Sequence, residues 1–375
     1  MTLIAPGSKI LVTGANGFVA VWLVQALLEQ DYCVRGTVRS QEKGTFLLDK
    51  FKSYGEKFEV VVVEDFTKDG AFDEAVKGVE AIQHTASPFH FNADDPKGMC
   101  IEQYSRFINT IRACLFTELI DPAVNGTVGI LQSASKYAPN VKRIVILASC
   151  GSILRDADEP LTFDETDWNT QAPEEVKRLG RNASGVAKYR TAKTLAERAA
   201  WRFYDHKSQV NWDLTTIHPP FIFGPVAHEV SSPKDLNTSA KEWYNVVAAP
   251  NSSGRSNDFL AEVGSSWVDV RDVAASLVKA MNVKEAGGER IIVNAGHYIW
   301  QDWLNIANSL TPSPIPSHAP GTEKALPVGN TEAIKNPVYM IKYNTAKEKR
   351  ILGLTYRTME ETTRDTLADY ERRGW

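Results

Sequence analysis

The segment KILVTGANGFVA, residues 9–20, joins a short β-branched run to two glycines and then to the start of an amphipathic helix. Apolar residues at helical spacing predict that this helix covers Phe18–Glu29. Glycines at this junction let the backbone approach a phosphate, and a helix start offers free N–H donors. Strand, glycine loop and helix in this order are therefore typical of a dinucleotide site. An ordinary strand–turn–helix junction is the alternative. The candidate phosphate-binding residues are Gly14, Asn16, Gly17, Phe18 and Val19.

Short β-branched runs alternate with helical patterns along much of the chain. Two of the helical patterns cover Pro122–Tyr137 and Ala187–Tyr204. Because the runs are almost continuously apolar, both faces of the sheet must be covered, which is typical of parallel strands between two helical layers. The sequence therefore predicts an α/β fold, a doubly wound parallel sheet of the Rossmann type. Its predicted strands are Lys9–Thr13, Cys33–Val38, Phe58–Val63, Ala81–Thr85, Arg143–Ala148, Leu214–His218 and Arg290–Asn294.

The composition changes after Pro219, where Pro, Ser, Asn and Gly become frequent. Helical patterns at Val273–Met281 and Trp300–Ser309 interrupt this region. We interpret residues 1–217 as the dinucleotide-binding domain and residues 218–375 as a smaller C-terminal substrate lobe. Within the lobe, residues 265–300 are expected to return to the core of the first domain.

The overall composition excludes several classes of function. The 375 residues include 42 basic and 46 acidic side chains, a net charge of −4, so a nucleic acid or an anionic membrane is not an expected partner. No run approaches the ~18 apolar residues of a membrane span, and the N-terminus lacks a signal-peptide pattern. The seven histidines are scattered, and no cysteine pair forms a CxxC, so neither a metal site nor a disulfide scaffold is predicted. We expect a cytosolic protein. The four cysteines are Cys33, Cys100, Cys114 and Cys150.

The end of the second predicted strand indicates which dinucleotide binds. NAD-binding folds usually carry an acidic residue there, which holds the ribose 2′-hydroxyl. This chain has Arg39 instead, with Lys43 one turn later. A guanidinium binds a 2′-phosphate in a forked geometry, and an ammonium adds a point charge, so NADPH is favoured over NADH. The alternative is that both are solvated surface cations.

Two further strand ends carry candidate cofactor contacts. Asp65 could accept the adenine amino group with Phe66 against the ring, or Asp65 could cap a helix. The small residues Thr85, Ala86 and Ser87 suit a ribose that passes over the sheet edge. His84 and His90 are interpreted as core or loop residues rather than ligands.

Tyr189 and Lys193 stand at i and i+4 in a helical pattern, which places the phenol and the ammonium on one face. A nearby ammonium favours the phenolate and is expected to lower the tyrosine pKa, which makes the phenol a better proton shuttle. Ser149 ends a strand, where sheet topology places ligands, and its hydroxyl could hold a carbonyl oxygen. A second copy of the pattern, Tyr343 to Lys347, is predicted to be a solvated helix start.

Other segments support this site. The apolar, proline-containing stretch His218–Pro225 is expected to cover one face of the nicotinamide, or else to be a strand end turned by prolines. Trp267–Val273 is predicted to be an edge strand that leads into a capped helix, with a scaffolding role only. Cys150 is expected to line the pocket rather than act as a nucleophile, because no cationic partner is evident.

These motifs carry a resemblance to a known family. The chain is similar to the extended short-chain dehydrogenases/reductases, in the group that includes plant dihydroflavonol reductases and fungal aldehyde and ketone reductases. The resemblance covers nearly the whole chain. Its shared stretches are Gly14–Phe18, Arg39–Lys43, His84–Phe89, Asp121–Gly126, Phe223–Pro225, Leu236–Ser239 and Val268–Ala274.

The resemblance implies a Ser149–Tyr189–Lys193 triad and a 2′-phosphate held by Arg39 and Lys43. It also implies that Pro219 and Ile222 lie near the nicotinamide, and that Phe89 and Cys150 lie near the substrate. In a yeast member of the group a tyrosine stands at the position of Cys150, so a wider pocket is expected here. Leu147-Ala148 replace the usual Thr-Ser before the catalytic serine, which removes two hydroxyls but keeps the third.

An insertion at about 98–118 separates two segments that are almost adjacent in relatives. Compact domains seldom hold such long loops without a role. Gly98-Met99-Cys100 can be encoded across a GTATGT splice-donor sequence, so we hypothesise that the segment is a retained intron. Sequencing of the transcript tests this, and an mRNA that includes these codons would contradict it.

The expected activity is NADPH-dependent reduction of an aldehyde or ketone to an alcohol by a small-molecule enzyme, monomeric or homodimeric. Two alternatives stay open. A nucleotide-sugar epimerase or dehydratase would use the same fold with retained NAD, and a non-catalytic regulator would bind NADPH without turnover.

Overall fold

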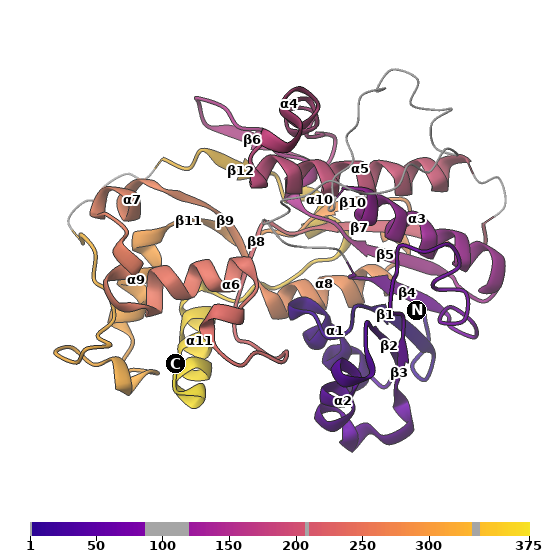
Figure 1. Ribbon diagram of the computed structural model, residues 1–375, viewed down its shortest axis with the longest axis horizontal. Helices are drawn as coiled ribbons and strands as arrows, with labels where there is room; N and C mark the ends of the chain where they lie inside the picture. Colours follow the sequence, from indigo (N-terminus) through magenta and orange to yellow (C-terminus); the bar gives the residue numbers. More distant parts are fainter. Residues whose placement is uncertain (1, 87–119, 207–209, 332–337) are drawn as a thin grey trace.

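The computed structural model describes residues 2–86, 120–206, 210–331 and 338–375 of the chain (Figure 1). Several expectations fall outside these residues and are not addressed by the structure. They concern Ser87, Phe89, His90 and the insertion at 98–118 with Cys100 and Cys114.

A seven-stranded parallel sheet forms the centre of the described chain, in the order β10-β7-β5-β4-β1-β2-β3. This order confirms the doubly wound Rossmann sheet. The central strands are apolar on both faces because helices cover both, so that every residue of β4 is buried. Four of the seven strands end one or two residues before their predicted ends. The strands are β1 Lys9–Thr13, β2 Cys33–Val38, β3 Phe58–Val62, β4 Ala81–His84, β5 Arg143–Leu147, β7 Asp213–His218 and β10 Arg290–Ile292.

Two layers of helices enclose the sheet (Figure 1). α1 (Phe18–Glu29) packs beside α8 (Val270–Asn282) on one face, and α3 (Ile120–Tyr137) packs beside α5 (Gly185–His206) on the other. The buried side of α5 is rich in alanine, which lets the helix approach α3 closely. α5 also carries Tyr189 and Lys193, so this close packing fixes the helix that bears two candidate catalytic residues.

The strand order reverses between β1 and β4, because the chain runs from β1 outward to β3 and then returns to β4. Ligands of doubly wound sheets bind outside the carboxyl ends of the strands at such a switch point. The glycine loop follows β1 and the segment from Thr85 follows β4, so both lie at this edge.

A second, three-stranded sheet of order β11-β9-β8 lies in the C-terminal part of the chain, beside an aromatic core (Figure 1). β9 is its central strand, which corrects the expectation of an edge strand; the capped helix is confirmed, because the Asp269 carboxylate accepts from Arg271 N at 2.8 Å. The tryptophans Trp243 and Trp267 each meet Trp303 edge-on. The elements are β8 Phe221–Phe223, β9 Gly264–Asp269, β11 Gly296–Ile299, α6 Thr238–Trp243, α7 Asn257–Glu262, α9 Trp300–Ser309 and α11 Met359–Arg373.

The second Tyr-x-x-x-Lys copy is not a solvated helix start. Tyr343 ends β12 (Ile341–Tyr343), which pairs with β6 (Leu161–Phe163), and its side chain is buried against Phe163. The helix α10 (Ala346–Ile351) begins only afterwards. The prediction failed because a strand pair distant in sequence buries this tyrosine. The remaining α-helices of the described chain are α2 Gln41–Lys50 and α4 Gln171–Leu179.

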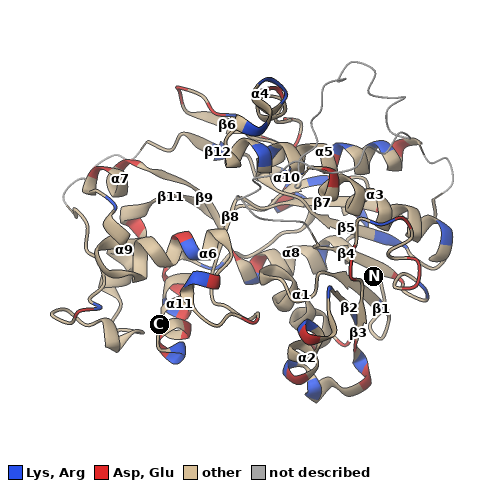
Figure 2. Ribbon diagram, viewed as in Figure 1, with Lys and Arg blue, Asp and Glu red and all other residues tan. Residues whose placement is uncertain are grey.

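Lys and Arg residues alternate with Asp and Glu residues along the described helices and loops (Figure 2). Among the described residues, no helix combines the length and the apolar character that crossing a membrane requires.

Candidate active site

The glycine loop has the geometry of a phosphate site. Gly14 adopts a φ of +63°, and a Cβ there would lie 3.1 Å from the Ala86 Cα. Both the backbone conformation and the lack of space therefore favour glycine at this position. The N-cap of α1 is Gly17, which supplies no side-chain cap. In the described part of the chain, the N–H groups of Phe18 and Val19 consequently have no acceptor. Free donors at the positive end of a helix favour an anion.

The ends of β1 and β4 are joined by hydrogen bonds beside this loop. The Thr13 hydroxyl oxygen accepts from the N–H groups of Thr85 and Ala86, both at 3.1 Å, and contacts His84 Nδ1 at 3.0 Å. His84 is buried, and burial, with a smaller effect from the charge of Lys193, lowers its pKa to about 3. It is a neutral part of the floor of the site, as expected for a core residue.

The two candidate 2′-phosphate residues differ in their partners. Arg39 is exposed and makes no hydrogen bond or ion pair with any residue that the structure describes. Lys43 is also exposed, but its ammonium lies 2.9 Å from the Glu229 carboxylate. This bond and, against it, slight burial leave the pKa of Lys43 above its usual value. Arg39 is thus the cation that needs to break no contact in order to bind an anion.

Asp65 caps a turn, not a helix. Its carboxylate accepts from the Thr67 N–H at 3.0 Å and the Thr67 hydroxyl at 2.6 Å, and these bonds lower the pKa of Asp65. Phe66 packs against α3 at Gly126, where a Cβ would collide with the ring. The structure therefore corrects the helix-cap alternative, and contact of either residue with adenine stays a prediction.

Ser149 and Tyr189 meet at the carboxyl end of the sheet. The Tyr189 phenol donates to Ser149 Oγ at 3.3 Å, and Ser149 Oγ accepts from Gly151 N at 2.9 Å. Lys193 lies one helical turn after Tyr189, and its ammonium donates to the Leu147 carbonyl at 3.5 Å. The three candidate catalytic residues thus come from the end of β5 and from α5.

The pKa values at this site depend mainly on burial. Burial raises the pKa of Tyr189, and the hydrogen bond to Ser149 lowers it only in part. This direction is the reverse of the one expected from the sequence, because desolvation of the phenolate outweighs any nearby cation. Burial also lowers the pKa of Lys193 to about 8, although Glu197 opposes the shift.

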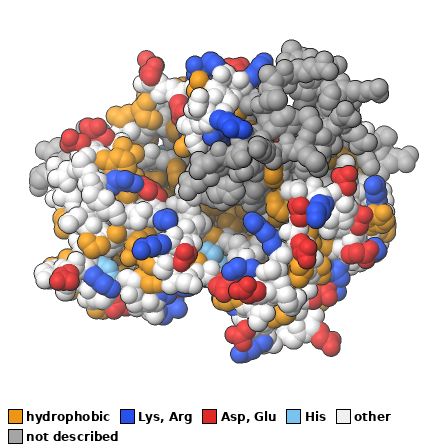
Figure 3. Space-filling model, viewed as in Figure 1, with side chains coloured by type: hydrophobic (Ala, Val, Ile, Leu, Met, Phe, Trp, Pro, Cys, Tyr) orange, Lys and Arg blue, Asp and Glu red, His pale blue; other side chains and the backbone are white. Residues whose placement is uncertain are grey.

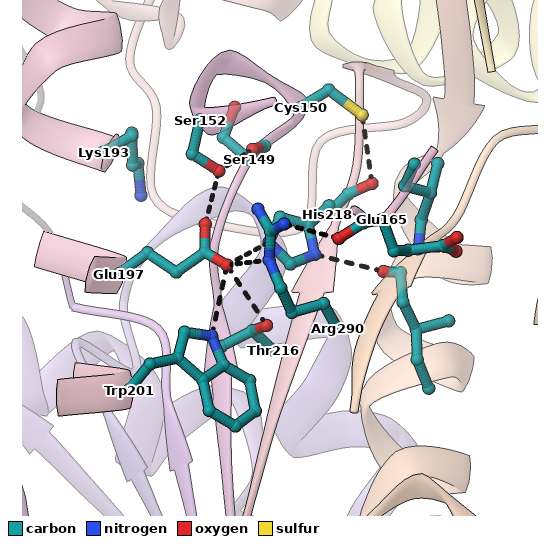
Figure 4. A network of polar contacts seen from close by, with 12 residues as sticks. Ser149, Cys150, Ser152, Glu165, Lys193, Glu197, Trp201, Thr216, His218 and Arg290 are labelled. Carbon is teal, nitrogen blue, oxygen red and sulfur yellow. Dashed lines mark hydrogen bonds and ion pairs between the residues drawn. The ribbon is translucent and has the colours of Figure 1, made fainter. Parts of the chain in front are cut away.

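Pro219 and Ile222, expected near the nicotinamide, and Cys150, expected near the substrate, differ in burial and in direction. Pro219 is buried at the end of β7, and its carbonyl accepts from Cys150 N at 3.0 Å; Ile222 is half-buried in β8. The Cys150 thiol points away from Ser149 and donates to the His218 carbonyl at 3.2 Å (Figure 4). It is 1% exposed within an apolar cluster with Tyr343, and burial raises its pKa. This placement corrects the expectation that Cys150 lines the pocket.

Sequence reasoning missed a buried polar network below these residues (Figure 4). Its centre is Glu197, which follows Lys193 by one turn on α5 and is 2% exposed. The spacing of four residues between Lys193 and Glu197 was the available signal, because it places both on one helix face. The carboxylate accepts hydrogen bonds from the side chains of Ser152, Trp201, Thr216, His218 and Arg290.

The molecule is hollowed between the sheet domain and the C-terminal part, on the face shown in Figure 3. A pocket of about 630 Å³ opens between α1 and α11, with Trp22, His228 and Arg373 among its lining residues. Its lining does not include Ser149, Tyr189 or Lys193. The candidate catalytic residues therefore lie outside this pocket.

Comparisons with known proteins agree with this arrangement. The sequence pattern of the NAD dependent epimerase/dehydratase family matches residues 10–99. The chain is 34% identical to the ketoreductase AzaE of Aspergillus niger, over 96% of each chain. It is 33% identical to the NADPH-dependent methylglyoxal reductase of Saccharomyces cerevisiae, again over 96% of each chain.

Solved structures extend the likeness to the fold. The yeast methylglyoxal/isovaleraldehyde reductase Gre2, in complex with NADPH, superposes with a TM-score of 0.77 at 32% identity and covers 98% of this chain and 99% of its own. Gre2 of Candida albicans with NADPH gives a TM-score of 0.78 at 29% identity, with the same coverage. Full-length relatives above 30% identity, the parallel sheet and the glycine loop agree, and the chain therefore belongs to the NAD dependent epimerase/dehydratase family of extended short-chain dehydrogenases/reductases.

Proposed function

We propose that the protein reduces an aldehyde or ketone to an alcohol, with NADPH as the hydride donor and Ser149, Tyr189 and Lys193 as its catalytic residues. The observation that supports this most is the 3.3 Å contact between the Tyr189 and Ser149 hydroxyls at the carboxyl end of the sheet. Relatives that are named NADPH-dependent reductases support the same chemistry.

The residues present fit NADPH. The open N–H groups at the start of α1 suit the pyrophosphate, and the exposed Arg39 guanidinium suits the 2′-phosphate. Thr85 and Ala86 lie at the edge of the same site, beside the glycine loop. Pro219 and Ile222 are expected to contact the nicotinamide. When bound, NADPH supplies the hydride that reduces the carbonyl carbon.

The protein residues handle the oxygen and its proton. The Ser149 and Tyr189 hydroxyls lie close enough to hold one carbonyl oxygen between them. As that oxygen gains negative charge, the Tyr189 phenol donates its proton, so that one hydride and one proton together give the alcohol. A high pKa keeps the phenol protonated at neutral pH, which is the form that a reduction needs. The Lys193 ammonium stabilises the phenolate that remains.

A panel of aldehydes and ketones tests this function by loss of NADPH absorbance. We expect oxidation of NADPH with at least one simple carbonyl compound and a matching amount of alcohol. Tight NADPH binding without turnover on the whole panel would instead indicate a regulator. Conversion of a nucleotide sugar without net consumption of cofactor would indicate an epimerase.

The pH dependence of the reaction follows from Lys193. Because its pKa is lowered to about 8, the ammonium is present below that pH and is lost as the pH rises through it. We therefore expect kcat/KM for reduction to be level near neutrality and to fall above about pH 8. Initial rates between pH 6 and pH 10 check this, and a profile that stays level to pH 10 would remove Lys193 from the mechanism.

The expected cytosolic location and monomeric or homodimeric state stay predictions.

A further inference from the structure

Glu197 is a buried charge that the proposed mechanism does not use. It lies on the same face of α5 as Tyr189 and Lys193, at successive intervals of four residues. Its carboxylate is 2.8 Å from His218 Nε2 and 2.7 Å from Arg290 Nε. A buried carboxylate is costly unless it is paired, so a complete set of partners at this depth points to a specific role.

The first link runs from Glu197 to Ser149. The Ser152 hydroxyl lies 2.5 Å from the Glu197 carboxylate and 2.8 Å from the Ser149 carbonyl. Both neighbours are acceptors and the hydroxyl has one proton, so the nearer, charged carboxylate receives it. Ser152 ends the short turn η3 (Cys150–Ser152) that begins directly after Ser149. Glu197 thus anchors the turn whose Gly151 N–H donates to Ser149 Oγ.

The second link runs from Glu197 to Lys193. Burial alone would raise the pKa of Glu197, but its electrostatic interactions and hydrogen bonds with His218 and Arg290 outweigh this effect and lower the pKa to about 2. The carboxylate is therefore ionised throughout the working pH range, and its charge favours the ammonium of Lys193 one turn away.

The other titratable groups that face Lys193 come from its own helix and from the strands below. Burial lowers the pKa of His84, on β4, to about 3 and raises the pKa of Tyr189, so both are uncharged near neutrality. Among the described residues, Glu197 is the group whose negative charge favours the Lys193 ammonium.

We propose that Glu197 is a positioning residue of the reductase, which holds the turn that orients Ser149 and supplies the buried negative charge that keeps Lys193 an ammonium. The inference rests on the proposed function for its effect on turnover, but its effect on Lys193 exists without cofactor or substrate.

The test is Glu197→Gln, which keeps the shape of the side chain and removes its charge. Competitive acetylation of the cofactor-free protein with acetic anhydride, read by mass spectrometry of the Lys193 peptide, measures the pH midpoint of that amine directly. We expect the midpoint to move to lower pH than in the parent, and kcat to fall about tenfold through misplacement of Ser149. The alkaline fall in kcat/KM should move to lower pH by the same amount.

Asp205→Asn is the matched control, because it removes an exposed carboxylate from the same helix two turns beyond Glu197. It should leave the midpoint and kcat unchanged. Arg290→Met removes a cation that offsets Glu197, so the Lys193 midpoint should move the opposite way, to higher pH. A loss of packing alone cannot give shifts of opposite sign.

The outcomes separate the two proposals. If the parent enzyme is active, an unchanged Lys193 midpoint together with an unchanged kcat in Glu197→Gln would overturn the proposed role of Glu197. A parent that reduces no carbonyl compound overturns the proposed function, while the acetylation midpoints still decide the charge effect. If Glu197→Gln does not fold, Ser152→Ala decides: a fall in kcat with unchanged NADPH affinity supports the anchor, and an unchanged kcat refutes it.

Discussion

Replacing Tyr189 with phenylalanine is expected to lower kcat for carbonyl reduction by about 10³-fold, or about 4 kcal/mol of activation free energy. The substitution removes one oxygen, the atom that lies 3.3 Å from Ser149 Oγ and that is proposed to donate the proton. The ring and the packing of α5 against α3 stay in place. NADPH binding, measured by titration of nucleotide fluorescence, should therefore change little, so the loss appears in kcat and not in cofactor affinity.

The chain offers a matched control for this prediction in its second Tyr-x-x-x-Lys copy. Tyr343 has the same spacing to Lys347, but it ends β12 and is packed against Phe163 behind the site. Tyr343→Phe should keep kcat within a small factor of the parent value. Equal losses in the two variants would mean that a buried hydroxyl matters only for packing, and retained turnover in Tyr189→Phe would remove the phenol from the reaction.

The contrast between these two tyrosines shows what sequence patterns can and cannot decide. The fold was predictable because the seven apolar runs and the glycine loop are local signals, and the strand order follows from rules for doubly wound sheets. The meeting of Ser149 and Tyr189, 40 positions apart, was expected from the place of each in such a fold and from the family resemblance. The burial of Tyr343 was not, because it depends on a strand pair that joins residues about 180 positions apart in the chain.

The electrostatics of the site needed the structure as well. The i, i+4 spacing of Tyr189 and Lys193 predicted a lowered tyrosine pKa, but burial raises it. A sequence shows which charges are neighbours along a helix, but it does not show how much water each one loses. The partners of Glu197 illustrate the same limit, because His218 and Arg290 come from two strands and meet it only in the folded sheet.

Replacing Arg39 with alanine is expected to weaken NADPH binding by about 10- to 100-fold and NADH binding by less than about twofold. Hydrogen bonds from a charged donor contribute about 1.5–3 kcal/mol, and only NADPH carries the 2′-phosphate that would receive them. Arg39 is exposed and is not held by any described residue, so its full interaction is available to the ligand. Dissociation constants for both nucleotides, measured by calorimetry on the same preparation, check the prediction.

The conservative variants separate charge from geometry at this position. Arg39→Lys keeps the cation but loses the forked donor pair, so its NADPH affinity should fall between those of the parent and Arg39→Ala. Lys43→Ala should weaken NADPH binding less than Arg39→Ala, because Lys43 must break its ion pair with Glu229 before it can bind a phosphate. Equal weakening of NADPH binding and NADH binding in Arg39→Ala would show that the guanidinium supports the loop and does not bind the 2′-phosphate. The preference for NADPH would then have to come from another cation at the same sheet edge, and Lys43, one turn along α2, is the nearest in sequence.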